Sequence, residues 1–188
     1  MQNDKPQGQQ IGWLHLDTEY PFTYRMFRIR RDKVRLPIGK ETDYAYMESK
    51  GAVWVVPVTD DSQLVLIKQY RYAVDDWTWE VPAGGKHDHA GTDEELARRE
   101  LSEEVGATAH SFQYVGWFYA AVSIASEKCH VFLARGVRLD GSPHREPGEI
   151  IEVHPVPVDE ALALARRGEI KDGKSALALL LCEPLLKG

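Results

Sequence analysis

A helix with strong end signals, predicted over residues 92–106, constrains the fold more than any other feature of the chain. Thr92 and Glu95 have the spacing of a capping box, and Gly106 suits a left-handed C-terminal cap. The apolar stripe that would pack this helix against a core consists of Ala97, Leu101 and Val105. Strands are predicted on both sides of it, so the helix belongs to a mixed fold of helices and sheet.

The acidic face of the same helix carries the clearest functional signal. Glu100, Glu103 and Glu104 stand at i, i+3 and i+4, the offsets that bring side chains together on a helix surface. Carboxylates at this spacing repel one another unless a cation neutralises them. The pattern therefore favours a divalent metal site over an ordinary solvated helix face.

A glycine pair precedes the helix, and the two segments together resemble a known family. Residues 79–85, Trp-Glu-Val-Pro-Ala-Gly-Gly, predict a strand that runs into a tight glycine-rich loop, where backbone can approach a ligand closely. Gly84 and Gly85, followed by Arg-Glu-Leu-Ser-Glu-Glu-Val-Gly-Ala at 99–107, resemble the signature of the Nudix hydrolases. The second half of that signature matches at every defined position.

The first half of the signature departs from the family pattern. Eight residues before Arg99, where the pattern has a glutamate, the chain has Gly91. A one-residue insertion within 86–90 accounts for the altered spacing. Glu95, four residues before Arg99, is placed to pair with it instead.

The resemblance covers residues 45–185 and implies the fold. Further segments at 69–71, 79–84 and 153–161 are similar to the branch of ADP-ribose pyrophosphatases and nucleoside-diphosphate-sugar hydrolases. This implies an α/β fold class, a Nudix-type α/β/α sandwich with a mixed β-sheet. Apolar runs and turn residues predict strands at 52–58, 63–69, 111–119, 128–134 and 150–155, and helices at 159–167 and 174–183.

Three regions are expected along the chain. Residues 1–10 are polar and predicted to be disordered. Residues 11–45 predict a strand-rich N-terminal arm, which by analogy with the branch favours a homodimer. Residues 46–188 form the expected hydrolase domain.

The resemblance also implies a metal site and its cofactor. It implies Mg²⁺, with Mn²⁺ as an alternative, held by the Ala83 carbonyl oxygen, Glu100, Glu103, Glu104 and Glu149. The implied catalytic residues are Glu103, which is a third ligand or an outer partner, Glu149 or in second place Glu146 from a late loop, and Arg99, which orients the glutamates.

Substrate contacts are implied for a second group of residues. Arg71 matches an arginine that contacts substrate in this branch, and Arg28 on the arm could reach a substrate across a dimer interface. A guanidinium group binds phosphate through two hydrogen bonds or stacks on a base. The remaining implied contacts are Glu127, in a loop that lacks the Ser-Pro-Gly of the family, and the backbone of Gly84 and Gly85.

Composition excludes several other classes. A formal charge of −6 disfavours a nucleic-acid binder, and the chain has no apolar run long enough to span a membrane. Residues 1–10 lack the apolar stretch of a signal peptide, so a cytoplasmic location is expected. Cys129 and Cys182 do not have metal-binding spacing.

The sequence therefore predicts Mg²⁺-dependent hydrolysis of the diphosphate linkage in a nucleoside diphosphate derivative, with ADP-ribose or a nucleotide sugar as the leading small-molecule substrate. The products would be a nucleoside monophosphate and a sugar phosphate. Coenzyme A, NADH and dinucleoside polyphosphates stay open as substrates. Two alternatives are a Nudix-fold module that binds a nucleotide without cutting it, and a structural calcium-binding domain.

Overall fold

The larger sheet of the molecule is built around strand β4 (Ala52–Thr59). The computed structural model describes residues 5–186, and within them β4 runs antiparallel to β5 (Gln63–Arg71) and parallel to β9 (Lys128–Val137). The strand order is β10-β5-β4-β9-β8, and two short strands, β6 and β7, pair with β5 and β4. The bounds of the remaining strands are Asp76–Glu80 for β6, Ala83–Gly85 for β7, Ser111–Tyr119 for β8 and Ile151–Pro157 for β10.

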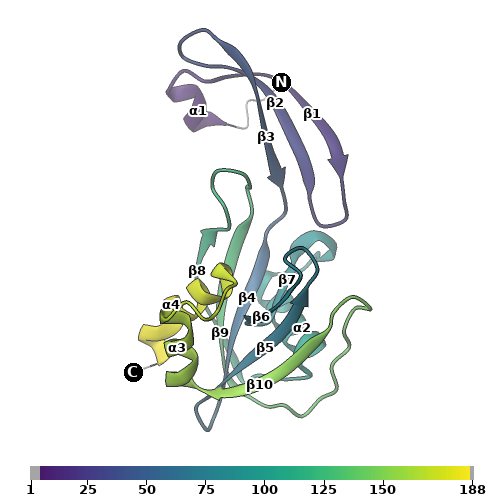
Figure 1. Ribbon diagram of the computed structural model, residues 1–188, viewed down its shortest axis with the longest axis vertical. Coiled ribbons are helices and arrows are strands. Elements are labelled where there is room, and N and C mark those ends of the chain that lie inside the picture. Colours follow the sequence, from purple (N-terminus) through teal and green to yellow (C-terminus); the bar gives the residue numbers. More distant parts are fainter. Residues whose placement is uncertain (1–4, 187–188) are drawn as a thin grey trace. The chain divides into compact units, whose positions relative to one another are not determined.

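Helices cover both faces of this sheet. Every residue of β4 from Ala52 to Val58 is buried, as expected for a strand whose two faces are both covered. Helix α2 (Asp93–Val105) lies on one face, and helices α3 (Val158–Arg166) and α4 (Gly173–Leu186) lie on the other (Figure 1). The predicted α/β/α sandwich with a mixed sheet is confirmed.

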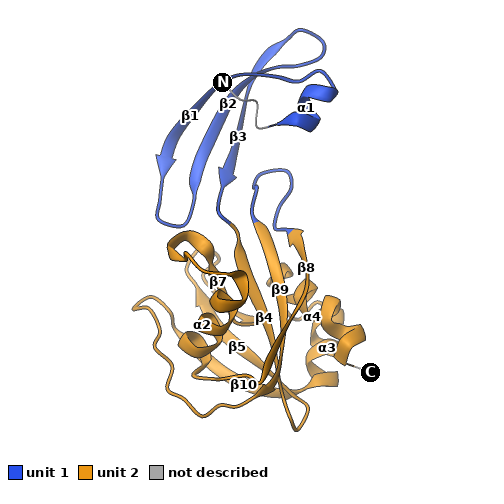
Figure 2. Ribbon diagram, turned by 180° about the vertical axis from the view of Figure 1, so that it is seen from behind, with its two compact units in different colours: residues 1–50, 119–127 blue, residues 51–118, 128–188 orange. Residues whose placement is uncertain are grey.

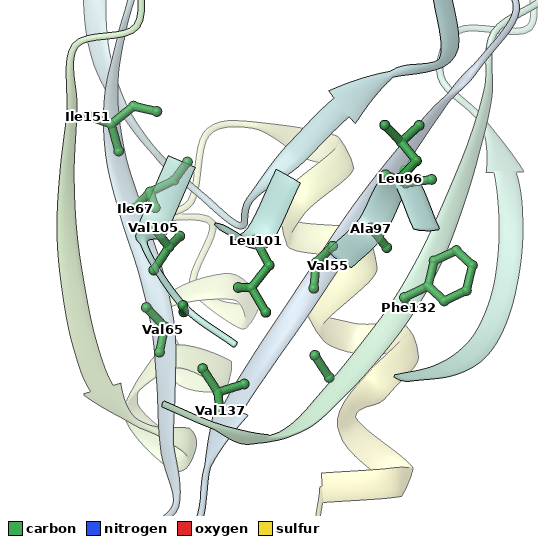
Figure 3. Close-up of a cluster of buried hydrophobic side chains, with 13 residues drawn as sticks. Val55, Val65, Ile67, Leu96, Ala97, Leu101, Val105, Phe132, Val137 and Ile151 are labelled. Atoms are coloured by element: carbon green, nitrogen blue, oxygen red, sulfur yellow. The ribbon is translucent and has the colours of Figure 1, made fainter. Parts of the chain in front are cut away.

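The apolar stripe of α2 fixes the helix on the sheet. Leu101 and Val105 face Val65 and Ile67 of β5 in a buried cluster that also contains Val55 of β4 (Figure 3). Burial of these side chains removes apolar surface from water and holds the helix in place. The acidic face of α2 is thereby set at a fixed position beside the sheet.

The ends of α2 are as predicted. The Thr92 hydroxyl accepts a hydrogen bond from the Glu95 amide, and the Glu95 carboxylate accepts one from the Thr92 amide, so the capping box is complete. Gly106 ends the helix with φ +70°, a conformation that glycine adopts without strain. Local sequence therefore determines both ends of the helix.

Replacing Thr92 with alanine tests this cap. Loss of an N-cap side chain typically costs about 1 kcal/mol of unfolding free energy, and we expect a loss of that size here. Urea denaturation with the wild type in parallel measures it. Thr92→Ser keeps the hydroxyl and should stay close to the wild type, whereas equal stability of Thr92→Ala and the wild type would contradict the role of the cap.

The chain divides into two units, shown in different colours in Figure 2. One consists of residues 1–50 and 119–127, and the other of residues 51–118 and 128–188. The boundary at 50/51 differs from the expected one at 45/46, which falls inside strand β3 (Glu41–Glu48). The segment 119–127 lies in the first unit, although the sequence-based division placed it in the hydrolase domain.

The first unit contains a three-stranded antiparallel sheet, in agreement with the predicted strand-rich arm. Its order is β1 (Leu14–Thr23), β2 (Arg28–Arg35) and β3. Arg30 and Asp32 are buried on one face of β2, where Arg30 Nε donates to Asp32 Oδ1 at 2.8 Å. These two charges are therefore paired within the unit.

Two local predictions were wrong. Pro6–Gln10 form a short helix, α1, instead of a disordered segment, and its start fits the preference of proline for the first helical position; residues 1–4 of that prediction lie outside the described part of the chain. Gly84 and Gly85 lie in strand β7, which pairs with β4, and not in a loop. The strand pairing adds backbone hydrogen bonds that a loop lacks.

Candidate active site

Strand β7 and helix α2 meet at the two most buried carboxylates of the acidic face. The Ala83 amide donates to Glu104 Oε2 at 3.0 Å, and Glu104 is 3 % exposed. A Cβ atom on Gly84 would lie 2.0 Å from Glu100 Cδ, so the carboxylate can stay in its present position only beside a glycine. The family-type glycine is thus required for the close approach of a glutamate side chain to the backbone.

Both carboxylates are costly to ionise where they stand. Burial raises the pKa of Glu100, and the charges of Glu103 and Glu149 add to the rise, while Arg99 opposes it. Burial raises the pKa of Glu104 well above its ordinary range, with the charge of Glu100 as the next cause. Burial raises the pKa of both carboxylates, and the charge of Glu100 raises that of Glu104 further, so a cation placed beside them would be stabilised.

The other two predicted residues of the helix lie at the margin of this pair. Arg99 Nη2 donates to Glu100 Oε1 at 3.1 Å, and Arg99 Nε lies 3.6 Å from Glu103 Oε2. The Glu103 side chain is 45 % exposed. Arg99 therefore pairs with both glutamates, and Glu103 stands at the solvent edge of the site; the orienting role of Arg99 stays a prediction.

Glu95 has a different partner from the predicted one. Its carboxylate closes the capping box with Thr92, whereas Arg99 pairs with the carboxylates that follow it. A Cβ atom on Gly91 would lie 2.4 Å from Glu95 Oε2 and 2.9 Å from His89 Nε2. The predicted pairing of Glu95 with Arg99 was wrong, because the cap competes for the same carboxylate.

Glu149, in the late loop, lies close enough to the acidic pair for its charge to act on both glutamates. The charge of Glu149 contributes to the raised pKa of both Glu100 and Glu104. One carboxylate oxygen of Glu149, Oε2, accepts a hydrogen bond from the Glu146 amide at 2.8 Å. Glu146, the second choice of the sequence analysis, is exposed and contributes this amide.

Arg71 reaches the same region from the end of β5. Arg71 Nε and Nη2 donate to the two carboxylate oxygens of Glu80, at 2.8 and 2.6 Å. The pairing raises the pKa of Arg71, and the charge of Arg71 in turn lowers that of Glu104. Sequence reasoning gave no role to Glu80, although an acid in a buried strand is rarely left unpaired and this signal was available.

Three other predicted residues belong to the other unit or make a different contact. Arg28 and Glu127 belong to the first unit, where Arg28 pairs with Glu48 and stacks on the Tyr20 ring at 3.9 Å. Gly85 follows Gly84 in β7, and a Cβ atom there would lie 2.7 Å from His87 Nδ1. The structure gives Gly85 a packing role next to the site.

The donor set suits a hard divalent cation. Within residues 5–186, no three His, Cys, Asp or Glu side chains are grouped so that they alone could hold a metal ion. Mg²⁺ is commonly held by one or two carboxylates, with waters and substrate phosphates completing its shell. The buried pair of Glu100 and Glu104, packed against Gly84 and the Ala83 amide, fits that arrangement.

Comparisons with known proteins agree with this geometry. The family model described as NUDIX domain matches residues 48–178. The ADP-ribose pyrophosphatase of Bacillus subtilis is 33% identical, over 86% of this chain and 87% of its own length. The ADP-ribose pyrophosphatase of Mycobacterium tuberculosis is 33% identical, over 92% of this chain and 84% of its own length.

A solved structure has the same fold. The crystal structure of an ADP compounds hydrolase superposes with a TM-score of 0.81 at 25% identity, and the match covers 94% of this chain and 95% of that one. No helix in the described part of the chain is long and apolar enough to cross a membrane.

Proposed function

Because the chain belongs to the Nudix family, we propose that it hydrolyses the diphosphate linkage of ADP-ribose or, as the next candidate, of a nucleotide sugar. The chain is a Nudix hydrolase with pyrophosphatase relatives. The observation that carries the proposal is the buried pair of Glu100 and Glu104 beside Gly84. Two relatives of similar length are named for the hydrolysis of ADP-ribose, which favours that substrate.

We propose Mg²⁺ as the metal, with Glu100 and Glu104 as its carboxylate ligands and Glu103, Glu149 and the Ala83 carbonyl oxygen as further candidates. When bound, the metal neutralises charge on the diphosphate oxygens and lowers the pKa of a bound water. Mn²⁺ also prefers oxygen ligands and would substitute.

The protein's own residues then divide the remaining tasks. Glu149 accepts the proton of the attacking water on its carboxylate, for which its position beside the acidic pair suits it. Arg99 keeps the carboxylates of Glu100 and Glu103 in place. Arg71 uses two N–H groups on Glu80, and its other N–H groups are offered to a substrate phosphate.

We propose a homodimer formed through the N-terminal arm. The end of β1 and the turn that follows it expose apolar side chains, with Phe22 at 53 % and Tyr24 at 57 %, and exposed apolar groups that gather in a patch often mark an interface. In such an assembly, Arg28 of the arm would reach a substrate across the interface. Sedimentation of the full chain measures the state, and a monomer at micromolar concentration would contradict it. The cytoplasmic location stays a prediction.

A substrate panel tests the proposed activity. The purified chain is incubated with Mg²⁺ and ADP-ribose, a nucleotide sugar, coenzyme A, NADH or a dinucleoside polyphosphate, and the products are separated by ion exchange. We expect AMP and ribose 5-phosphate from ADP-ribose. Binding without turnover across the panel would favour a nucleotide sensor and contradict the proposal.

Replacing Arg71 with lysine tests substrate contact. Lysine keeps the charge but loses the two-pronged geometry, so we expect KM to rise roughly tenfold with little change in kcat, the cost of about one charge-assisted hydrogen bond. Initial rates against ADP-ribose concentration measure both constants. Arg98→Lys, on the exposed side of α2 where Arg98 pairs with Glu94, is the matched control. An unchanged KM would remove Arg71 from the site.

A further inference from the structure

The loop between β9 and β10 is fastened to the C-terminal end of α2. The last carbonyl groups of a helix have no partner within the helix and need one from elsewhere. Here the His144 amide donates to the Glu103 carbonyl oxygen at 2.8 Å, and the Gly141 amide donates to that of Gly106 at 2.9 Å. The loop that carries Glu149 is thus attached to the helix that carries the acidic pair.

One side chain completes this attachment. Arg145 Nε donates to the Glu104 carbonyl oxygen at 2.9 Å, and Arg145 Nη1 donates to the Ile151 carbonyl oxygen at 2.6 Å. Ile151 begins β10, opposite Gln69 of β5. A single guanidinium therefore joins the end of α2 to the start of β10, and Glu149 lies in the short stretch between Arg145 itself and Ile151.

The chemistry of this contact explains why it needs arginine. Two N–H groups in a fixed planar fork reach two carbonyl oxygens at once, which the single ammonium group of lysine cannot do with the same geometry. The positive charge also lies at the negative end of the α2 dipole, where it stabilises the helix end. Both hydrogen bonds of Arg145 go to main-chain carbonyl oxygens, so they leave the carboxylate oxygens of the nearby glutamates available to other partners.

We infer that Arg145 is a positioning residue that holds Glu149 against the Glu100–Glu104 pair. This rests on the proposed function, because Glu149 matters only if it acts in hydrolysis. The two hydrogen bonds of Arg145 go to the main chain, so no contact with the substrate is assigned to it. It acts through Glu149, whose carboxylate must be held close to its working place for efficient proton transfer.

A double-mutant cycle separates this role from general stabilisation. Arg145→Gln should lower kcat for ADP-ribose hydrolysis about 10- to 100-fold with KM nearly unchanged, the range found when groups that orient active-site ligands are removed. In a Glu149→Gln background, the same substitution should cost less than about twofold, because the residue through which it acts is already disabled. Equal losses in both backgrounds would overturn the inference.

Two further variants keep the test decisive. Arg145→Lys retains the charge and should recover part of kcat; if Arg145→Gln does not fold, the lysine variant is carried through the same cycle. Arg138 is an exposed arginine before the same loop, and its main chain exchanges hydrogen bonds with Thr108. Arg138→Gln should therefore keep the kcat of the wild type. Wild-type kcat in both Arg145 variants would refute the positioning role.

The outcomes also distinguish this inference from the proposed function. A wild-type chain that hydrolyses nothing refutes the proposed function before the cycle begins. An active wild type with a fully active Glu149→Gln variant leaves the hydrolase in place and overturns the inference alone. Hydrogen exchange at the Glu146 amide, which binds the Glu149 carboxylate, should become faster in Arg145→Gln; unchanged exchange would contradict the loss of loop order.

Discussion

Replacing Glu104 with glutamine is expected to lower kcat/KM for ADP-ribose at least 100-fold while the chain stays folded. The carboxylate lies in the most buried part of the acidic pair, and glutamine has nearly the same shape without the charge. Losing a preorganised charge in a catalytic site typically costs about 10²- to 10³-fold in rate. Steady-state kinetics with saturating Mg²⁺, together with circular dichroism, measures both parts of this expectation.

The same substitution should stabilise the metal-free protein at neutral pH. Burial raises the pKa of Glu104 above its ordinary value of 4.5, so its ionisation favours the unfolded state at every pH above that value. The wild type should lose stability as the pH rises from 4.5 through the raised pKa, and Glu104→Gln should lack this part of the loss. Urea denaturation in EDTA across this range tests the sign.

Glu152→Gln is the matched control for both measurements, because Glu152 is an exposed glutamate on β10. It should keep wild-type activity and a wild-type pH dependence of stability. If Glu104→Gln retains activity within about twofold of the wild type, Glu104 is not part of the catalytic machinery.

Replacing Gly84 with alanine is expected to produce the second large effect. The new Cβ atom would lie 2.0 Å from Glu100 Cδ, so the carboxylate or strand β7 has to move. A displacement of about 1 Å in a catalytic group can cost roughly 100-fold in rate, and we expect a loss of that order in kcat. Because Glu100 is also buried, unfolding free energy should fall as well.

A glycine elsewhere in the chain provides the comparison. Gly173 has no atom within 4 Å of an added Cβ, and Gly173→Ala should therefore behave as the wild type. Wild-type kcat and stability in Gly84→Ala would show that Glu100 relaxes at no cost, and would contradict the requirement for glycine beside this carboxylate.

Local signals in the sequence predicted the elements that hold the site. The capping residues of α2 and the apolar runs of β4 and β5 depend on near neighbours in the chain, so both can be recognised in the sequence. The acidic face could be read in the same way, because the helix period alone places Glu100 and Glu104 together. Both features appear in the structure as predicted.

Other features depend on contacts between distant segments and could not be read. The close approach of Gly84 to Glu100 requires β7 to pair with β4 while α2 packs across the sheet, and no local pattern encodes that distance. The two hydrogen bonds of the Arg145 guanidinium depend on where the loop passes the end of α2. The choice of Glu149 over Glu146 rested on the family resemblance, since both glutamates stand in the same short segment.

The competition for Glu95 shows a further limit. Spacing favoured two partners for its carboxylate, Arg99 at i, i+4 and the Thr92 amide in the capping box. In the structure the Glu95 carboxylate accepts a hydrogen bond from the Thr92 amide, because the first amides of a helix lack partners within the helix. The i, i+4 spacing alone could not have decided between Arg99 and the Thr92 amide as the partner of Glu95.

Titration of the full chain with Mn²⁺, followed by electron paramagnetic resonance of the free ion, tests the central claim most directly. The account predicts saturable Mn²⁺ binding by the wild type in the presence of a non-hydrolysable ADP-ribose analogue. We expect Mn²⁺ binding to be at least tenfold weaker in Glu104→Gln, which corresponds to a loss of about 1.4 kcal/mol in binding free energy. We expect no saturable binding when Glu100→Gln is added. Equal Mn²⁺ affinity in the wild type and the double variant would contradict the claim that this buried pair of carboxylates holds the metal.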